Sequence, residues 1–174
     1  MGSSVLDQRG MAPQPGAALL GNVAYIPPGL EGKFKRPFTY NAFFASIAQN
    51  ATQTVTININ NDSFFVCVQA TADIWDQATG NTTNTAPNLA AMTVLIADSS
   101  SGQNQMDIAT PVGALFGTAL QPFVWLYRAN LFFPGGTMQV TLTNRMAATQ
   151  RVQLSFSGFK VYRQPDENVA KNYN

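Results

Sequence analysis

Apolar and polar positions alternate along most of the chain with a period of two. Val55, Ile57 and Ile59 alternate with threonine and asparagine, and the same pattern holds for residues 138–143 and 152–157. Alternation of this kind places one face of a β-strand in a core and the other face in water. We therefore expect strands in these stretches. Apolar runs bounded by turn residues predict further strands at 64–72, 92–98, 106–112 and 123–133.

Residues 38–47 fit two patterns. Their apolar side chains fall at positions 40, 43, 44 and 47, the spacing of a helix, and also at 38, 40, 42 and 44, the spacing of a strand. We favour a strand, because every segment downstream has the β pattern. The total of about eight short strands predicts an all-β fold, an antiparallel β-sandwich of the jelly-roll type.

Turn residues separate the expected strands. Residues 60–63 and 99–102 each join two strands tightly, and residues 134–136 supply glycine where a hairpin turn needs a positive φ. The last three strands therefore read as a meander. Within the final strand the apolar phase changes at Gly158, because the apolar residues after Phe156 are Phe159 and Val161. A glycine at a phase change suggests a β-bulge.

Residues 1–36 differ from the rest of the chain. They are rich in proline and glycine and show no periodicity, which is typical of an extended segment. We divide the chain into this N-terminal arm, a β-sandwich domain at 37–163 and a polar C-terminal tail at 164–174. An arm with little core of its own needs other contacts to hold it. We infer that it lies along a neighbouring subunit, and the alternative is an arm wrapped on its own domain.

Composition argues against most chemistry. The 174 residues include no histidine, one cysteine and only 11% charged residues, against about 25% in a typical domain. Histidine-assisted nucleophiles and zinc sites therefore lack their groups. The net charge of +1 is too small for an electrostatic grip on nucleic acid, and no apolar run is long enough for a membrane span. We expect no enzyme activity, no cofactor, no metal, no direct nucleic-acid contact and no membrane partner.

A few residues still have a possible chemical role. Asp73 and Asp76 flank Trp75, and Asp98 and Asp107 flank a serine-rich turn. Carboxylate pairs occur in glycosidases, and Asp73 and Asp76 with loop carbonyls suit calcium. We favour turn-forming aspartates instead, because all four lie near strand ends.

Cys67 is the single cysteine, so it has no partner within the chain for a disulfide. It sits in the apolar run of residues 65–68, with no basic residue close in sequence that would lower its thiol pKa. We therefore interpret it as a small buried hydrophobe rather than a reactive thiol.

Interface candidates come from the aromatic and basic residues. The run at 123–127 is apolar on both faces, so Trp125 and Tyr127 are expected to anchor the core or a subunit interface. A sugar-stacking platform that includes Trp75 is the alternative. The loop at 76–88, which is uncharged after Asp76, is either solvated or a protruding tip that contacts a neighbour or a ligand. The hinge of the arm is expected at Lys33, Phe34, Lys35 and Arg36.

Several short stretches resemble small β-sandwich virion proteins of tailed bacteriophages. They are residues 50–54, 59–65, 134–137, 142–144 and 156–162. The resemblance implies a non-enzymatic structural part of the virion, such as a capsid decoration protein or a collar or head–tail component. The partners it implies are other virion proteins of the capsid, portal or tail. We expect a homo-oligomer around a cyclic axis. The alternatives are a fibre component and a carbohydrate-binding receptor-recognition module.

Overall fold

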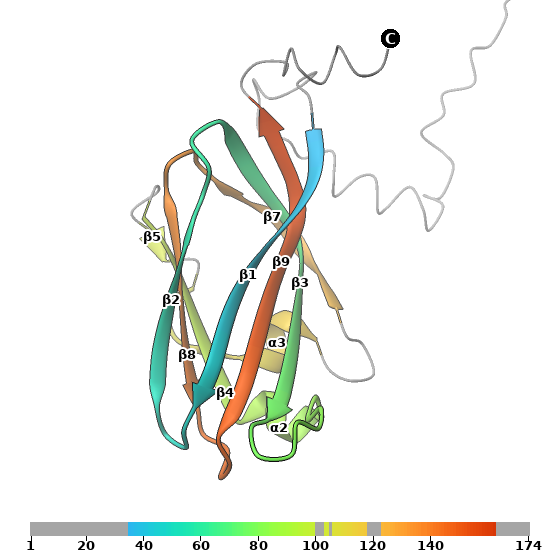
Figure 1. Ribbon diagram of the computed structural model, residues 1–174. Helices are drawn as coiled ribbons and strands as arrows, with labels where there is room; N and C mark the ends of the chain where they lie inside the picture. The colour runs from blue at the N-terminus through green and yellow to red at the C-terminus, as the bar shows by residue number, and fades with distance from the viewer. Residues whose placement is uncertain (1–34, 100–102, 105, 118–122, 163–174) are drawn as a thin grey trace, which may run out of the picture.

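The computed structural model describes residues 35–99, 103–104, 106–117 and 123–162, and two facing β-sheets make up most of this part of the chain (Figure 1). The strands are β1 (Lys35–Ile47), β2 (Thr52–Asn58), β3 (Ser63–Asp76), β4 (Met92–Asp98), β5 (Gln103–Asn104), β6 (Thr110–Pro111), β7 (Phe123–Phe132), β8 (Thr137–Asn144) and β9 (Gln150–Tyr162). Sheet A has the order β1-β9-β3-β7, and sheet B has the order β2-β8-β4-β5 with β6 also paired to β4. The expected all-β sandwich is confirmed.

The strand pairing identifies the sandwich as a jelly roll. β1 pairs with β9, β2 with β8, β3 with β7 and β4 with β6, all antiparallel, so the chain folds like one long hairpin. The β3–β9 and β4–β8 pairs then join these hairpin arms into two sheets. With the two-residue β5 and β6 counted as one edge strand, this is the eight-stranded, double Greek-key arrangement of a jelly roll.

The expected meander at the end of the chain is wrong. β7 and β9 lie in sheet A, whereas β8 lies in sheet B between β2 and β4. Gly135 does adopt the expected positive φ, 74°, but its turn carries the chain from one sheet to the other. A turn motif determines the local backbone only. The sheet that the next strand joins is decided by where its apolar face is buried.

The strand expected at 106–112 is also wrong for most of its length. Only Thr110–Pro111 is a strand, and a short helix α3 (Val112–Phe116) follows it. Val112 and Phe116 are four residues apart, so one helical turn points both into the core, where they are 0% and 1% exposed. A second short helix, α2 (Ala86–Ala90), buries Leu89 in the same way.

The ambiguous segment at 38–47 is a strand, as favoured. β1 alternates buried Tyr40, Ala42 and Phe44 with exposed neighbours, and it pairs with β9 along most of its length. β1 forms the edge of sheet A, and it begins at the same end of the sandwich at which β9 ends (Figure 1).

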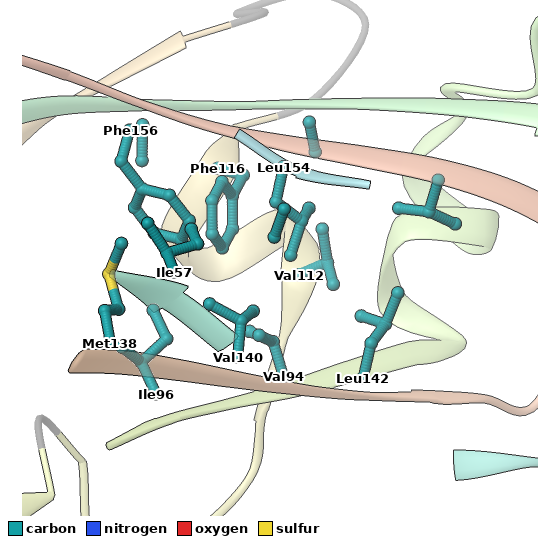
Figure 2. Packing of buried hydrophobic residues seen from close by; sticks show 14 of the residues in the cluster. Ile57, Val94, Ile96, Val112, Phe116, Met138, Val140, Leu142, Leu154 and Phe156 are labelled. Atoms are coloured by element: carbon teal, nitrogen blue, oxygen red, sulfur yellow. The ribbon is translucent and has the colours of Figure 1, made fainter. Parts of the chain in front are cut away.

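The core lies between the sheets. Figure 2 shows Leu154 and Phe156 projecting from β9 toward residues of β4 and β8, with Phe116 of α3 between the layers. The rings of Phe116 and Phe156 meet edge to face, with their centroids 5.5 Å apart. α3 therefore fills space between the sheets that neither sheet fills alone.

One buried amide fastens two turns at the far end of the sandwich. Asn144, at the end of β8, is 0% exposed, and its Nδ2 donates to the carbonyl oxygens of Ile47 and Ala148 at 2.9 and 3.0 Å. Its Oδ1 accepts from the backbone N–H of Met146 at 2.8 Å. The β1–β2 and β8–β9 connections are thus tied to one buried side chain, whose own polar atoms are all hydrogen bonded.

Candidate functional site

The outer face of sheet A is apolar at the end where β1 begins. We call this surface the apolar patch; its members are Phe64, Val66 and Val68 of β3, Leu131 of β7, and Phe159 and Val161 of β9. Phe64 lies opposite Val161, and Val66 lies opposite both Phe159 and Leu131, so the patch crosses three adjacent strands. These strands carry apolar residues on both faces here, because Phe65 and Phe132 point into the core.

The patch explains the phase change near Gly158, and it corrects the expected bulge in the last strand. β9 pairs with β1 in unbroken register from Val152 to Val161. The register shift lies instead in β3, where Val68 is the extra residue between Cys67 and Gln69. Because β9 keeps its alternation, Phe159 and Val161 point outward. The phase change therefore marks the point at which the apolar face of the strand switches sides.

Gly158 permits this arrangement. A Cβ atom at this position would overlap the carbonyl oxygen of Val66 and lie 3.0 Å from the Cα of Cys67. The bulged strand β3 thus approaches β9 more closely than a side chain allows.

The other half of the outer face of sheet A is polar. Thr39 and Ser157 hydrogen bond across β1 and β9 at 3.0 Å. On the next rung, Ser155 donates to Asn41 Oδ1 at 2.7 Å, and Gln153 donates to the same oxygen at 3.5 Å. These hydrogen bonds join uncharged side chains of β1 and β9.

The outer face of sheet B carries rows of threonine. Thr52 pairs with Thr143 and Thr54 with Thr141, and each pair shares a hydroxyl hydrogen bond of 2.8 Å. None of the outward residues in the rungs across β2, β8 and β4 is charged. They are Thr52, Thr54, Thr56, Thr143, Thr141, Gln139, Thr93, Leu95 and Ala97.

Trp75 lies at the polar end of sheet A. The guanidinium of Arg151, its partner on β9, sits 5.1 Å from the centre of the indole ring. The backbone of Trp75 forms a bridge with Thr82, so the loop after β3 folds back beside it. Asp73 precedes this corner on the same strand face, where its carboxylate accepts from Asn84 at 3.3 Å.

The aspartates around Trp75 serve the loop, as the turn interpretation predicted. Asp76 Oδ1 accepts from the backbone N–H of Thr79 at 2.8 Å, from that of Ala78 at 2.9 Å, and from the Thr79 hydroxyl at 3.1 Å. The bond from the Thr79 backbone is the largest cause that lowers the pKa of the Asp76 carboxyl below its ordinary value. A lowered pKa suits a turn acceptor rather than a proton donor.

Asp98 and Asp107 lie in different surroundings. Asp98 is 3% exposed on the inner face of β4, whereas Asp107 is exposed. The described residues include no group of three or more histidine, cysteine, aspartate or glutamate side chains placed to hold a metal ion. None of the helices in the described ranges has the length and apolar character needed to cross a membrane.

Cys67 is buried, as expected. It is 1% exposed, and burial raises the pKa of its thiol to about 12. Such a thiol is almost wholly protonated at neutral pH and is a poor nucleophile. Cys67 borders a cavity of about 70 Å³ with a largely apolar lining that includes Phe132, Phe156 and Met106.

Lys160 is a buried cation that the sequence analysis did not single out. It is 4% exposed, and its ammonium lies 3.8 Å from the centre of the Phe38 ring and 5.5 Å from that of Tyr40. It occupies an inward position of β9, opposite Phe65. The sequence did contain a signal for this position. Strand residues two apart share a face, so Lys160 lies on the same inward face as Phe156.

The predicted interface residues do not form one site. Lys33 and Phe34 lie outside the described residues, whereas Lys35 and Arg36 are exposed at the start of β1, so any hinge precedes Lys35. Lys35 pairs with Val161 beside the apolar patch, but Trp75 lies near the opposite end of β3.

Trp125 and Tyr127 belong to β7, where the Trp125 backbone pairs with Gln69. Their side chains lie outside the described part of the structure, so their anchoring role stays a prediction. The arm at 1–34 and the tail after 162 likewise lie outside it.

No protein-family model and no curated protein sequence matches the chain. Among solved structures, the chain is similar to the crystal structure of the infectious bursal disease virus VP2 subviral particle, with 14% sequence identity and a TM-score of 0.25. The match covers 79% of this chain and 44% of that chain, so this chain spans less than half the length of that protein. The jelly roll described above rests on the strand pairing and not on this likeness.

Proposed function

We propose that this chain is a non-enzymatic structural protein of a virus particle, which self-associates and binds other virion proteins. The observation that carries the proposal is the chemistry of its two outer faces. Sheet B presents rows of uncharged threonines, and sheet A presents the apolar patch beside a polar surface on which most side chains are uncharged. Contacts through such faces bury little charge, so they avoid the large desolvation cost of buried ions.

The jelly roll supports the proposal by analogy. Viral capsid proteins and lectins both use this architecture, so the fold is compatible with assembly and with sugar binding. Of the two, assembly makes better use of the faces described here, because the uncharged threonine rows of sheet B can be covered by a partner without desolvating ions.

Within this class, we place the chain as a capsid decoration protein of a tailed bacteriophage; a collar, head–tail or fibre component is the alternative. The stretches that resemble phage virion proteins support this placement, because stretches far apart in sequence are neighbours in the fold. Residues 63–65 pair with 160–162, and residues 52–53 pair with 142–143. The resemblance therefore covers contacting regions of one fold.

Two measurements test the proposal. Light scattering during gel filtration gives the mass in solution, and sedimentation with particles stripped of the protein measures attachment. We expect an oligomer of the 18.8 kDa chain that sediments with the particles. A monomer that binds no particle at any concentration contradicts the proposal, and so does turnover of a substrate.

The corner around Trp75 favours one second candidate, a carbohydrate-binding module. An indole on an outer sheet face, with Arg151, Asp73 and Gln153 beside it, offers a stacking surface rimmed by hydrogen-bonding groups. A glycan array tests this with Trp75→Ala. The matched control is Phe133→Ala, because Phe133 is 44% exposed and lies just beyond β7. Glycan binding lost in the first variant and kept in the second supports the module.

A further inference from the structure

We propose that β2 is the strand through which this protein self-associates, and that it pairs antiparallel with β2 of a second copy across a two-fold axis at Val55. The pairing joins the two copies of sheet B into one continuous sheet. This inference deepens the proposed function and rests on it in one respect, that the protein forms a homo-oligomer. It adds the strand, the orientation and the register of the contact.

β2 is an edge strand with one unpaired side. Sheet B has the order β2-β8-β4-β5, and within the described residues β8 is the one strand that pairs with β2. On the β8 side, the carbonyl of Ala51 accepts from the N–H of Asn144 at 3.0 Å, and the N–H of Ile59 donates to the carbonyl of Gly136 at 2.9 Å. Backbone groups alternate in direction along a strand, so the odd-numbered residues between Ala51 and Ile59 also face β8. The even-numbered residues of β2 therefore direct their N–H and C=O groups away from β8.

This open edge lacks the features that usually keep edge strands apart. Unpaired backbone groups form a template for another strand, and proteins block them with very short strands, lysine, proline or bulges. β2 has seven residues, none charged and none proline, and it pairs with β8 in unbroken register. Its even-numbered residues are all exposed: Thr52, Thr54, Thr56 and Asn58.

The other sheet edges in the described structure do carry such features. β1 begins with Lys35, Arg36 and Pro37, and its register with β9 shifts between Phe44 and Ile47. β5 and β6 have two residues each. The pairing of β7 with β3 is interrupted by a register shift. Among these edges, β2 is the one whose sequence leaves it open to pairing.

The edge of β2 suits a second copy of itself. A symmetric antiparallel pair brings each strand against an identical strand, so like charges would meet and repel. β2 carries no charge, and self-pairing therefore meets no such repulsion. A two-fold contact uses the same surface on both subunits, which makes it the commonest form of self-association.

One register uses every open backbone group of β2. Val55 then lies opposite its own counterpart, with Thr54 opposite Thr56 of the second copy. Thr52 lies opposite Asn58 in the same way. Each threonine pair and each Thr52–Asn58 pair exchanges two backbone hydrogen bonds, because both members direct their groups to the shared edge. Val55 is only partly buried against the core in one copy, and this register brings the two Val55 side chains together.

Disulfide trapping tests the register. Cys67, the native cysteine, is replaced by alanine, so that the introduced thiol reports alone. Val55→Cys places two thiols on a non-hydrogen-bonded antiparallel pair, whose Cα atoms lie about 4.5 Å apart and within reach of a disulfide. We expect oxidation to give a covalent species of twice the 18.8 kDa chain mass. Thr52→Cys on the same strand is the control, because its counterpart lies about 20 Å away along the strand, and we expect no bridge.

A pair of lysine variants tests the edge without cysteines. Thr54→Lys places a charge on the edge twice in each dimer, and it is expected to raise the dissociation constant by about tenfold or more in analytical ultracentrifugation. The matched control is Thr141→Lys, because Thr141 of β8 shares a hydroxyl hydrogen bond of 2.8 Å with Thr54. Both variants lose this bond and add the same charge to the same face, but only Thr54 lies on the edge strand. We expect Thr141→Lys to leave the dissociation constant unchanged.

The outcomes separate this inference from the proposed function. An oligomer that forms no Val55→Cys bridge, or that withstands Thr54→Lys, associates through another surface or pairs β2 with a different segment. Loss of the oligomer in both lysine variants shows contact through the face of sheet B and not through its edge. Each of these results overturns the inference and leaves the proposed function standing.

Particle binding decides the remaining cases. A protein that is monomeric at every concentration but sediments with particles overturns the inference and leaves attachment to the particle standing. A monomer that binds no particle contradicts both the inference and the proposed function. A dimer that bridges at Val55→Cys but binds no particle supports the inference and contradicts the virion role.

Discussion

Gly158 of β9 lies against the backbone of Val66 on β3, where a Cβ atom would overlap the valine carbonyl oxygen. This contact is where β3 bulges, and beyond it the apolar residues of β9 point outward. The position therefore affects two properties, the stability of sheet A and the outward orientation of Phe159 and Val161.

Gly158→Ala is expected to lower the free energy of unfolding by about 3 kcal/mol, because the strands must separate to admit a methyl group against backbone atoms. Urea denaturation measures the change. The control is Gly80→Asn, since nothing lies within 4 Å of a Cβ at Gly80 and asparagine tolerates its φ of 70°. Equal stabilities for the two variants would contradict the close approach.

Asn144→Ala is expected to destabilise the domain by about 3 kcal/mol. The change leaves the carbonyls of Ile47 and Ala148 and the N–H of Met146 without their side-chain partner in a buried corner. Thermal or urea unfolding checks this. Thr141→Ala, on the outer face of sheet B, is the control and is expected to change stability by less than about 0.5 kcal/mol. If Asn144→Ala were as stable as the unaltered protein, the hydrogen bonds of Asn144 would not stabilise the domain.

The stability of the domain is expected to fall more when the charge at position 160 is reversed than when it is removed. Lys160→Met keeps the length of the side chain and is expected to change stability by less than about 1 kcal/mol, since burying an ammonium has its own cost. Lys160→Glu places a carboxylate against the negative faces of Phe38 and Tyr40 and is expected to cost about 3 kcal/mol. Chemical denaturation of both variants provides the comparison. Equal effects would contradict the cation–π contact.

Stability is expected to fall as pH rises above about 9. Burial raises the pKa of the Cys67 thiol from 9.0 to about 12, so the folded state holds a proton that the unfolded chain releases in this window. The stabilisation is complete below pH 9 and is lost toward pH 12, with a slope of up to about 1.4 kcal/mol per pH unit. Burial also raises the pKa of the Tyr40 hydroxyl above its ordinary value of 10.0. The stabilisation that Tyr40 gives in its protonated form therefore begins to be lost above a pH of about 10.

Cys67→Ala identifies the thiol contribution to this loss. We expect the variant to lose the slope that begins near pH 9 and to keep the part due to Tyr40 at higher pH. Denaturation midpoints measured in steps between pH 8 and pH 11 give the slope. An unchanged slope would mean that the thiol is not protected from water.

Assembly is expected to resist salt. With 11% charged residues in the chain and none in the threonine rungs of sheet B, subunit contacts are expected to gain little from Coulomb attraction, so screening removes little. The mass in solution should stay the same between about 0.1 and 1 M sodium chloride. Dissociation over this range would point to ion pairs at the interface.

The strands themselves were predictable because alternation is a local property. Period-two patterns located β2, β8 and the first half of β9, and the β pattern of every downstream segment favoured a strand at 38–47, which is β1. The turn role of Asp76 was predictable for the same reason, since its partners lie within three residues. The short helix α3 was missed because Val112 was assigned to the end of the strand expected at 106–112, and Phe116 lies beyond that run.

The candidate surfaces were less accessible to sequence reasoning. Trp75 was recognised, but its Arg151 partner is 76 positions away and meets it only through the β3–β9 register. The phase change at Gly158 was recognised, but it was interpreted as a bulge in β9, whereas the bulge lies in β3. A change in the apolar face of β9 and a bulge in β9 give the same pattern of residues.

By itself, the sequence determined that this protein is built of β-strands and that it carries little charge. Both can be read directly from the residues, because alternation involves only near neighbours in sequence and composition involves no structure at all. Only the tertiary structure decided which sheet each strand joins, that Lys160 lies inside, and that Phe159 and Val161 lie outside. In sheet A, these depend on pairing of β9 with residues from 74 positions (Asp76 and Gln150) to 126 positions away (Lys35 and Val161), and this register is set by burial of the whole core and not by any local pattern.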